Sequence, residues 1–326
     1  MRLTRRGWGA LAVVGLAYAA AYLSGARALN AIVAPVLAAL AAGAILVARA
    51  DPPTVTYGSL RSGYPGQTRT LTVDVDGGGI VRLAQSLPNG LAAADLDVTV
   101  TPPHTIERTL TFANRGVYRL DPPFVRQRDP MGLVGKRVEA AVDLDFVVYP
   151  TVYDLDETHL SHLFSDELAA ERQEFDRLRE YVPGDPLKNV HWKSSAKYDD
   201  FLVMEFSPSQ RTETVHIVAD ADPGGADAMA TAAATLALGA LDAGLGVELT
   251  VPGEDVASGQ GEAHRENLLR VLAGASAGTV PDAVQQEADV SVHADGTGTR
   301  VRYGDQSKSF TDLLGTTGQR VGGVAA

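Results

Sequence analysis

Hydrophobic residues follow three successive patterns along the chain. Residues 8–23 and 28–48 are nearly continuous apolar runs, whereas apolar and polar residues alternate between Thr54 and Pro150. From Glu213 onward, short apolar runs alternate with stretches of helical composition. Continuous runs of about 20 residues predict transmembrane helices, alternation predicts half-buried strands, and strand–helix–strand order predicts a parallel sheet. We therefore expect two N-terminal transmembrane helices, then an all-β sandwich, then an α/β domain with a mainly parallel sheet.

The two apolar runs form the expected membrane anchor. A cleaved signal peptide is the alternative, because RLTRRGWGALAVV has a basic start and an apolar core, but the run at 28–48 would remain after cleavage. Three arginines precede the first run and Arg49 follows the second, while the loop between them holds only Arg27. Positive charge favours the cytoplasmic side, so both ends of the hairpin are expected there. This predicts a multi-pass protein of the cell membrane, embedded in the lipid bilayer, with a cytoplasmic soluble domain.

Turn residues and changes of composition set the expected domain boundaries. Segments such as RTLTVDV and VDLDFVVYP are separated by DGGG, PNG, ANRG and DPP, which is the spacing of an antiparallel sandwich. We expect a transmembrane hairpin at 1–50, the sandwich at 51–150, the α/β domain at 151–314 and a disordered tail at 315–326. Early in the α/β domain, SDELAAERQEFDRLRE is rich in helix formers and predicts a helix.

Charge is distributed unevenly over the chain. The formal net charge is −12, yet residues 1–50 contain five arginines and no acid. The rest of the chain carries 23 basic and 40 acidic side chains, a net charge of −17, which repels nucleic-acid phosphates and excludes DNA and RNA as partners. Abundant Asp with few lysines is typical of salt-adapted proteins of the haloarchaeal type. The absence of cysteine excludes disulfides and thiol catalysis.

ADAD, residues 219–222, is the candidate metal site. Asp220 and Asp222 are expected at the carboxyl end of the first strand of the α/β domain, where open α/β sheets bind ligands. A hard cation such as Mg²⁺ would accept their oxygens, but two solvated acids at a strand end are the alternative. The sequence has no phosphate-binding Gly-rich loop before Lys and Ser/Thr, no Gly-x-Ser-x-Gly and no His-Glu-x-x-His. We expect no catalytic residue and no cofactor, with Mg²⁺ as the one candidate metal.

A second candidate site lies in REYVPGDPLKNVHWKSSAK, residues 179–197. The chain has five lysines, and Lys188, Lys193 and Lys197 lie in this stretch together with Trp192. Pro-Gly predicts a turn and the following Asp-Pro predicts the start of a helix, but neither feature explains the lysines. An aromatic residue among cations is typical of a docking surface for an acidic partner. The alternative is that Trp192 is core and that the cations pair with acids of their own domain.

This stretch also resembles a known family. EFDRLREYVPGDPLKNVHWKSSAKYDDFLVMEF, residues 174–206, is similar to the signature of domain-of-unknown-function family 58 (DUF58), in which Arg-x-Tyr-x-Pro-Gly-Asp precedes His/Trp and Ser-Ala-Arg/Lys. NRGVYRLDPPFVRQRDPMGL, residues 114–133, is similar to the segment before that signature. The resemblance implies a membrane-anchored protein with a von Willebrand factor A-like C-terminal half, associated with a MoxR-type AAA+ ATPase. The metal site of the von Willebrand type needs Asp-x-Ser-x-Ser, and neither serine follows Asp220.

The cluster and the signature together give the expected docking residues. They are Arg179, Tyr181, Gly184, Asp185, Lys188, Trp192, Lys193, Ser195 and Lys197. The expected function is that of a membrane-anchored, non-enzymatic adaptor or scaffold that works with a MoxR-type AAA+ ATPase in the maturation or assembly of other proteins. A metal-dependent protein-binding module of the von Willebrand factor A type, using Asp220 and Asp222, is the alternative. An enzyme acting on envelope material would need a catalytic pair that the sequence does not show.

Overall fold

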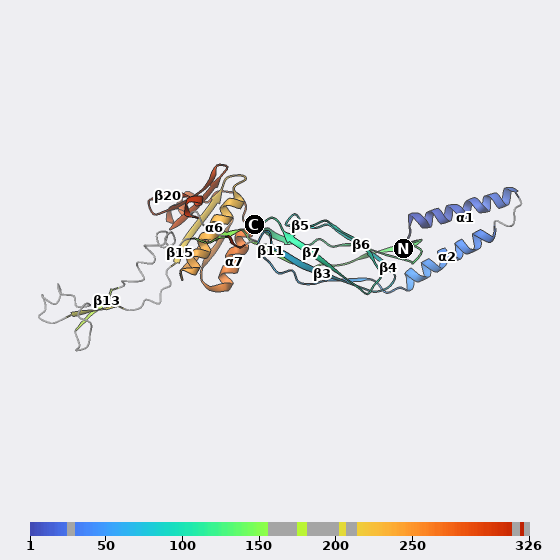
Figure 1. The fold of residues 1–326 in the computed structure, drawn as a ribbon, viewed down its shortest axis with the longest axis horizontal. Helices are drawn as coiled ribbons and strands as arrows, with labels where there is room; N and C mark the ends of the chain where they lie inside the picture. Colours follow the sequence, from blue (N-terminus) through green and yellow to red (C-terminus); the bar gives the residue numbers. More distant parts are fainter. Residues whose placement is uncertain (25–29, 156–174, 181–201, 207–213, 315–319, 323–326) are drawn as a thin grey trace. The chain divides into compact units, whose positions relative to one another are not determined.

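The computed structural model describes residues 1–24, 30–155, 175–180, 202–206, 214–314 and 320–322 (Figure 1). Contacts within the chain divide it into two compact units, Met1–Val148 and Tyr149–Ala326. Each unit has its own sheets and its own buried residues.

The first unit contains two helices, α1 (Arg5–Ser24) and α2 (Asn30–Arg49), which pack against each other. Among the described helices, only Ala31–Arg49 of α2 is long and apolar enough to cross a membrane. The prediction of two transmembrane helices is therefore wrong. The reason lies in the composition of α1, which begins with two arginines and contains three glycines, one tryptophan and two tyrosines.

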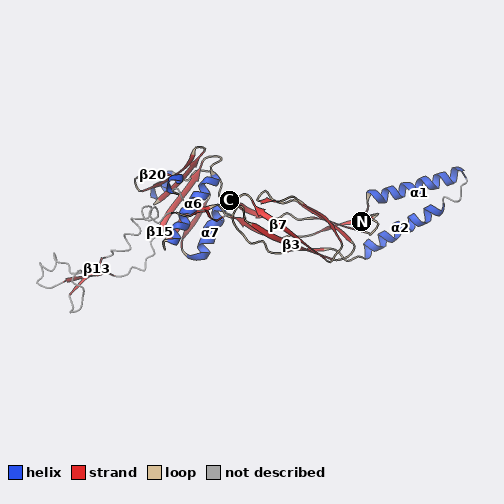
Figure 2. Cartoon of the chain, in the orientation of Figure 1, coloured by secondary structure: helices blue, strands red, loops and turns tan. Residues whose placement is uncertain are grey.

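The strands of the first unit, drawn in red in Figure 2, pair antiparallel, as their alternating pattern predicts. One sheet has the order β2-β3-β7-β5, with bounds Thr54–Tyr57, Thr68–Asp76, His104–Phe112 and Leu91–Ala92. A second sheet has the order β1-β10-β9-β4-β6, with bounds Arg2–Leu3, Val134–Glu139, Phe124–Arg128, Ile80–Gln85 and Leu96–Val100. A further pair joins β8 (Gly116–Arg119) to β11 (Asp145–Val148).

One apolar core is shared by the sheets of the first unit. Val73 of the four-stranded sheet and Leu83 and Val125 of the five-stranded sheet are fully buried members of the same cluster. Successive side chains of a strand project to opposite faces, so the positions between these core residues lie on the outer side. Arg82 and Arg126 occupy such positions and are half-buried. The outer face of the five-stranded sheet therefore carries arginines.

The start of α1 is attached to this five-stranded sheet. β1 pairs with β10, and the hydroxyl of Thr4 donates a hydrogen bond of 2.5 Å to the carbonyl of Gly132. Gly7 packs so closely that a Cβ atom at this position would lie 2.2 Å from the carbonyl oxygen of Leu133. Only glycine allows that approach, so the sequence fixes where the helix leaves the sheet.

The second unit contains a six-stranded sheet in the order β17-β16-β15-β18-β19-β20. In this order the bounds are Glu254–Gly259, Gly246–Val251, Thr214–Ala221, Val290–Asp295, Gly298–Tyr303 and Gln306–Ser309. β15 is parallel to both β16 and β18, whereas the three other pairs are antiparallel.

The sheet is thus mixed, and the prediction of a mainly parallel, von Willebrand factor A-like α/β domain is wrong. Two-residue connections join β16 to β17, β18 to β19, and β19 to β20. A connection this short can only form a hairpin between antiparallel strands, because a parallel pair needs a crossover of a dozen residues or more. Gly253 and Gly304 supply the positive φ angles, +85° and +50°, in two of these turns.

Helices α6 (Ala226–Asp242) and α7 (Gly261–Gly274) lie where the sequence pattern predicts helices. α6 packs against β15, β16 and β18, and α7 packs against α6. Because the sheet and α7 both pack against α6, ten of its side chains are buried, and most of these are alanines. The other described helices of this unit are short: α8 (Asp282–Glu287) and α9 (Phe310–Leu313).

Two further strand pairs belong to the second unit. β13 (Phe175–Glu180) pairs with β14 (Leu202–Phe206), so the end of the helix predicted from SDELAAERQEFDRLRE is a strand instead. Its earlier part lies outside the described residues. In the segment 315–326, predicted to be disordered, Arg320–Gly322 forms β21 and pairs with β12 (Val152–Tyr153). In both cases backbone pairing with a distant strand outweighs local composition.

Candidate functional site

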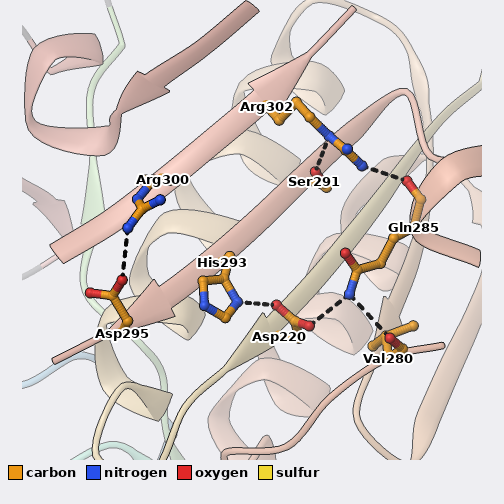
Figure 3. A network of polar contacts seen from close by, with 8 residues as sticks. All are labelled: Asp220, Val280, Gln285, Ser291, His293, Asp295, Arg300 and Arg302. Carbon is orange, nitrogen blue, oxygen red and sulfur yellow. Dashed lines mark hydrogen bonds and ion pairs between the residues drawn. The ribbon is translucent and has the colours of Figure 1, made fainter. Parts of the chain in front are cut away.

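Asp220 is the centre of a polar network on one face of the six-stranded sheet (Figure 3). It lies near the carboxyl end of β15 and is 5% exposed, which is rare for an aspartate. Along the neighbouring strand β18, Val290, Val292 and Ala294 are buried, whereas Ser291 and His293 between them are half-buried. The register pairs Asp220 with His293, so both side chains project from the more polar face.

Both carboxylate oxygens of Asp220 are engaged by neighbouring side chains. His293 Nδ1 lies 2.7 Å from Asp220 Oδ1, and Gln285 Nε2 of α8 donates to Oδ2 at 2.8 Å. An ionised carboxylate can only accept, so Nδ1 of His293 carries the proton in this pair. Gln285 Nε2 also donates to the carbonyl of Val280 at 3.1 Å. The buried carboxylate is therefore hydrogen-bonded at both oxygens, as burial of a charge requires.

Two arginines extend this network along β19. Arg302 donates to the carbonyl of Gln285 at 2.9 Å and to the hydroxyl of Ser291 at 3.1 Å. Arg300 pairs with Asp295 at 3.1 Å. Arg302 thus holds α8 against the sheet, and α8 in turn presents Gln285 to Asp220.

Asp295 ends β18 and accepts hydrogen bonds from the turn that follows it. The hydroxyl of Thr297 donates at 2.5 Å, its N–H at 2.7 Å and the N–H of Gly298 at 3.0 Å. These bonds, with the Thr297 hydroxyl as the largest cause, lower the pKa of Asp295 to about 2. The carboxylate of Asp295 is consequently committed to its own turn and to Arg300.

The Asp220–His293 pair has one chemically open position. The His293 side chain is 44% exposed, and among the described residues its Nε2 has no hydrogen-bond partner. A histidine oriented by a buried aspartate in this way is half of a nucleophile-activating arrangement. The other half would be a hydroxyl or thiol near Nε2, and within the described part of the chain no such group bonds to it. The described residues therefore orient a histidine but place no nucleophile in a hydrogen bond to it.

The two predicted metal ligands, Asp220 and Asp222, lie in different environments. Asp220 is engaged as described, while Asp222 is exposed and lies in the turn before α6. In that turn the N–H of Gly225 donates to the carbonyl of Asp222 at 2.8 Å, and Gly224 takes the positive φ of 94°. The described residues contain no group of three or more His, Asp or Glu side chains placed to hold a metal ion.

The docking residues predicted from the sequence fall mostly outside the described residues. Arg179 lies in β13, where its backbone is paired with Val203 of β14. The other eight are Tyr181, Gly184, Asp185, Lys188, Trp192, Lys193, Ser195 and Lys197, all in the stretch 181–201 that the structure does not describe. The docking surface remains a prediction.

The sequence analysis missed the partners of Asp220. His293 and Gln285 are 73 and 65 residues away along the chain, so no local motif joins them to Asp220. One signal was available: in VSVHAD, polar residues stand at alternate positions of a strand, which indicates one polar face. The polar face of this strand points to Ser291 and His293 as candidates, and only the register selects His293 as the neighbour of Asp220.

Comparison with known proteins supports a family but no activity. Residues 177–319 match the family model described as "Protein of unknown function DUF58", which supports the resemblance of residues 174–206. No curated protein matches the chain. One similar solved structure is the PKD domain of an M14-like peptidase from Thermoplasmatales archaeon SCGC AB-540-F20, with 14% identity over 28% of this chain and 94% of that chain. Its TM-score of 0.19 supports no statement about the fold of this chain.

Proposed function

We propose that this chain is a membrane-associated adaptor, without catalysis of its own, that works with a MoxR-type AAA+ ATPase in the maturation or assembly of other proteins. The observation that carries the proposal is that His293 and Gln285 occupy both carboxylate oxygens of Asp220. Because side chains of the same unit occupy this buried carboxylate, we assign the function of the unit to binding of a partner at its surface. The proposal includes no cofactor.

The apolar helix α2 supports the membrane part of this proposal. Its segment Ala31–Arg49 is 19 residues long, within the range that spans the hydrocarbon core of a bilayer. Large apolar side chains of α2 are exposed, among them Leu37, Ile45 and Leu46. Exposed apolar side chains along one helix favour contact with lipid over contact with water. We place the second unit on the cytoplasmic side of the membrane, and this placement rests on the arginine distribution alone.

The DUF58 match and the charge of the second unit support the partner part. Residues 149–326 carry 13 basic and 29 acidic side chains, a net charge of −16. The lysines of the expected docking residues are therefore a local exception in an acidic unit. Such an exception would select a partner with an acidic patch, because complementary charge sets partner choice and association rate. The match over residues 177–319 contains this stretch.

Capture of the ATPase tests the proposal. The full chain, purified in detergent, is immobilised and incubated with the MoxR-type ATPase of the same organism, with and without ATP. We expect the ATPase to be retained, and at least tenfold less of it to be retained by Lys188→Glu with Lys193→Glu. Arg270→Glu with Lys308→Glu is the matched control, because it makes the same change of charge at exposed residues of the same unit. That control should retain the ATPase as the unchanged chain does.

Three results would count against the proposal. If the unchanged chain fails to retain the ATPase, the ATPase is excluded as its partner. Equal retention by both double variants moves the docking surface away from the lysines. Retention that disappears when EDTA is added and returns with Mg²⁺ favours a metal-dependent binding module. Equal melting temperatures of the two variants are the check that neither substitution acts through unfolding.

A further inference from the structure

Arginines meet across three neighbouring strands on the outer face of the five-stranded sheet. Arg82 of β4 is paired with Arg126 of β9, and Arg126 is paired with Arg137 of β10. Directly paired residues of antiparallel strands project from the same face with Cβ atoms about 4.5–5.5 Å apart, and like charges at such positions destabilise the sheet. The row Arg82–Arg126–Arg137 therefore places like charges side by side. Asp97 pairs with Arg82, and the Phe124 ring lies against Arg126 and Arg137, but no described carboxylate pairs with the latter two.

The start of α1 places further arginines beside this row. A cleft of about 710 Å³ lies between the beginning of α1 and the sheet. Its charged lining residues are Arg5, Arg6, Arg82, Arg126 and Arg128. No Asp or Glu is among its described lining residues. The cleft is thus lined by positive charge contributed from three separate elements of the chain.

Little of this charge is neutralised within the described part of the protein. Arg82 donates to Asp97 at 2.8 and 2.6 Å, whereas the other four arginines of the cleft form no ion pair with a described carboxylate. The Nε atom of Arg128 is buried and, among the described residues, has no hydrogen-bond partner. Burial lowers the pKa of Arg128, and the charges of Arg126, Arg82 and Arg6 lower it further. An arginine nevertheless remains protonated at physiological pH, so the cleft stays cationic.

The chemistry of the cleft suits a phosphate group. A guanidinium donates two parallel N–H groups to phosphate oxygens, which is the strongest and most directional of the anion contacts that proteins make. Several guanidinium groups around one cleft can share the two or three free oxygens of one phosphate. A single carboxylate ligand would leave most of these donors unused.

The position of the cleft selects a lipid as the source of that phosphate. Arg128 also lines a hollow of about 430 Å³ together with Leu46, Val47 and Arg49, at the end of the candidate membrane span. The headgroup region lies directly outside the hydrocarbon core, at the level where a spanning helix ends. Arg128 thus links the end of the span to the arginine cleft.

We propose that Arg6, Arg126 and Arg128, together with Arg5 and Arg82, bind the phosphate of an anionic phospholipid such as phosphatidylglycerol. This inference rests on the proposed membrane association and adds a lipid preference to it. The like charges of the sheet face are then a built site, repulsive when empty and satisfied when a headgroup is bound.

Lipid binding to the full chain in detergent tests this inference. Fluorescent phosphatidylglycerol and phosphatidylcholine are titrated into separate samples, and inorganic phosphate is added as a competitor. We expect the unchanged chain to prefer phosphatidylglycerol at least tenfold, and Arg126→Gln with Arg128→Gln to lose this preference. Arg61→Gln with Arg119→Gln removes two exposed charges of the same unit away from the cleft and should keep the preference. Arg126→Lys with Arg128→Lys keeps the charge without the planar donor pair and should bind at an intermediate level.

The outcomes separate this inference from the proposed function. A chain that stays in the membrane fraction after alkaline extraction but binds both lipids equally overturns the lipid site alone. A chain that leaves the membrane fraction overturns the membrane association and the lipid site with it. Strong binding of inorganic phosphate without lipid preference assigns the cleft to free phosphate and overturns the lipid source. Loss of preference in the Arg61 and Arg119 control shows that overall charge, not the cleft, is responsible.

Discussion

Each unit of the protein carries a row of polar side chains across three neighbouring strands, and the two rows differ in the charges that they align. In the C-terminal unit the register aligns an acid, an imidazole and a cation: Asp220, His293 and Arg300. In the N-terminal unit the register aligns three cations: Arg82, Arg126 and Arg137. In the first row Asp220 and His293 are hydrogen-bonded to each other, whereas in the second row like charges stand side by side and only Arg82 has an ion-pair partner among the described residues.

The comparison shows how a polar network that stabilises the fold differs from one that is available to a ligand: the first has hydrogen-bond partners within the protein and the second lacks them. Asp220 is bonded by His293 and Gln285, so removal of any partner leaves a buried group unsatisfied. Arg126 stacks over the ring of Phe124, but the side chains of Arg126 and Arg128 have no hydrogen-bond or ion-pair partner among the described residues, so their removal leaves no polar group unsatisfied. The charges of whole units do not make this distinction: Met1–Val148 carries 15 basic and 11 acidic residues, a net charge of only +4. The distinction lies in which residues the strand register brings together.

The largest expected effect is the loss of stability when Asp220 is removed. Asp220→Ala deletes a buried carboxylate and two hydrogen bonds to it, which should lower the free energy of unfolding of the second unit by about 2–3 kcal/mol. For a unit of this size the melting temperature should fall by about 4–12 °C in scanning calorimetry. Asp222→Ala, an exposed aspartate two residues further along, is the control and should change the melting temperature little. Equal effects of the two substitutions would mean that the network does not hold the fold.

A smaller effect, opposite in sign, is expected at Arg128. Arg128→Met removes a charge that faces other arginines and a buried Nε without a partner, so the first unit should gain about 0.5–1 kcal/mol in detergent free of anionic lipid. Addition of phosphatidylglycerol should stabilise the unchanged chain but not the variant. Arg119→Met is the control, since Arg119 is exposed and pairs with Asp143 and Asp145. A loss of stability in Arg128→Met without lipid would show that the arginines of the cleft do not repel one another.

Most strands of the first unit could be predicted from the sequence because one face of each is buried. In β3, for example, Leu71, Val73 and Val75 are buried and the residues between them are not. The mixed character of the second sheet could not be read from strand–helix order, because the hairpins depend on two-residue turns such as Pro252–Gly253. The first predicted span, residues 8–23, is wrong for a different reason: glycine and aromatic residues interrupt the hydropathy of α1.

The candidate site was only half predictable. Asp220 stands out because a strand end in an α/β sheet is a common place for ligands. Its partners come from β18 and α8, and only the register of β15 with β18 places His293 beside it. The arginine row has the same origin, since Arg82 and Arg126 are 44 residues apart in sequence and meet through strand pairing. Long-range register is the information that a single sequence lacks.

The smallest expected effect concerns acid stability at Asp295, beside the C-terminal row. The hydroxyl and N–H of Thr297 and the N–H of Gly298 lower the pKa of Asp295 from 3.8 to about 2. Because the folded pKa lies below the unfolded one, the carboxylate contributes fully to stability above about pH 4, and this contribution is lost as pH falls through about 2. Calorimetry should therefore show a steeper loss of stability below pH 4 in the unchanged chain than in Asp295→Asn, which keeps an oxygen acceptor but does not titrate. Asp305→Asn controls for the loss of one exposed acid. Arg300 is the last of the causes, so Arg300→Gln should leave the slope nearly unchanged. A slope halved by Arg300→Gln would mean that the row's ion pair, rather than the turn, holds this carboxylate.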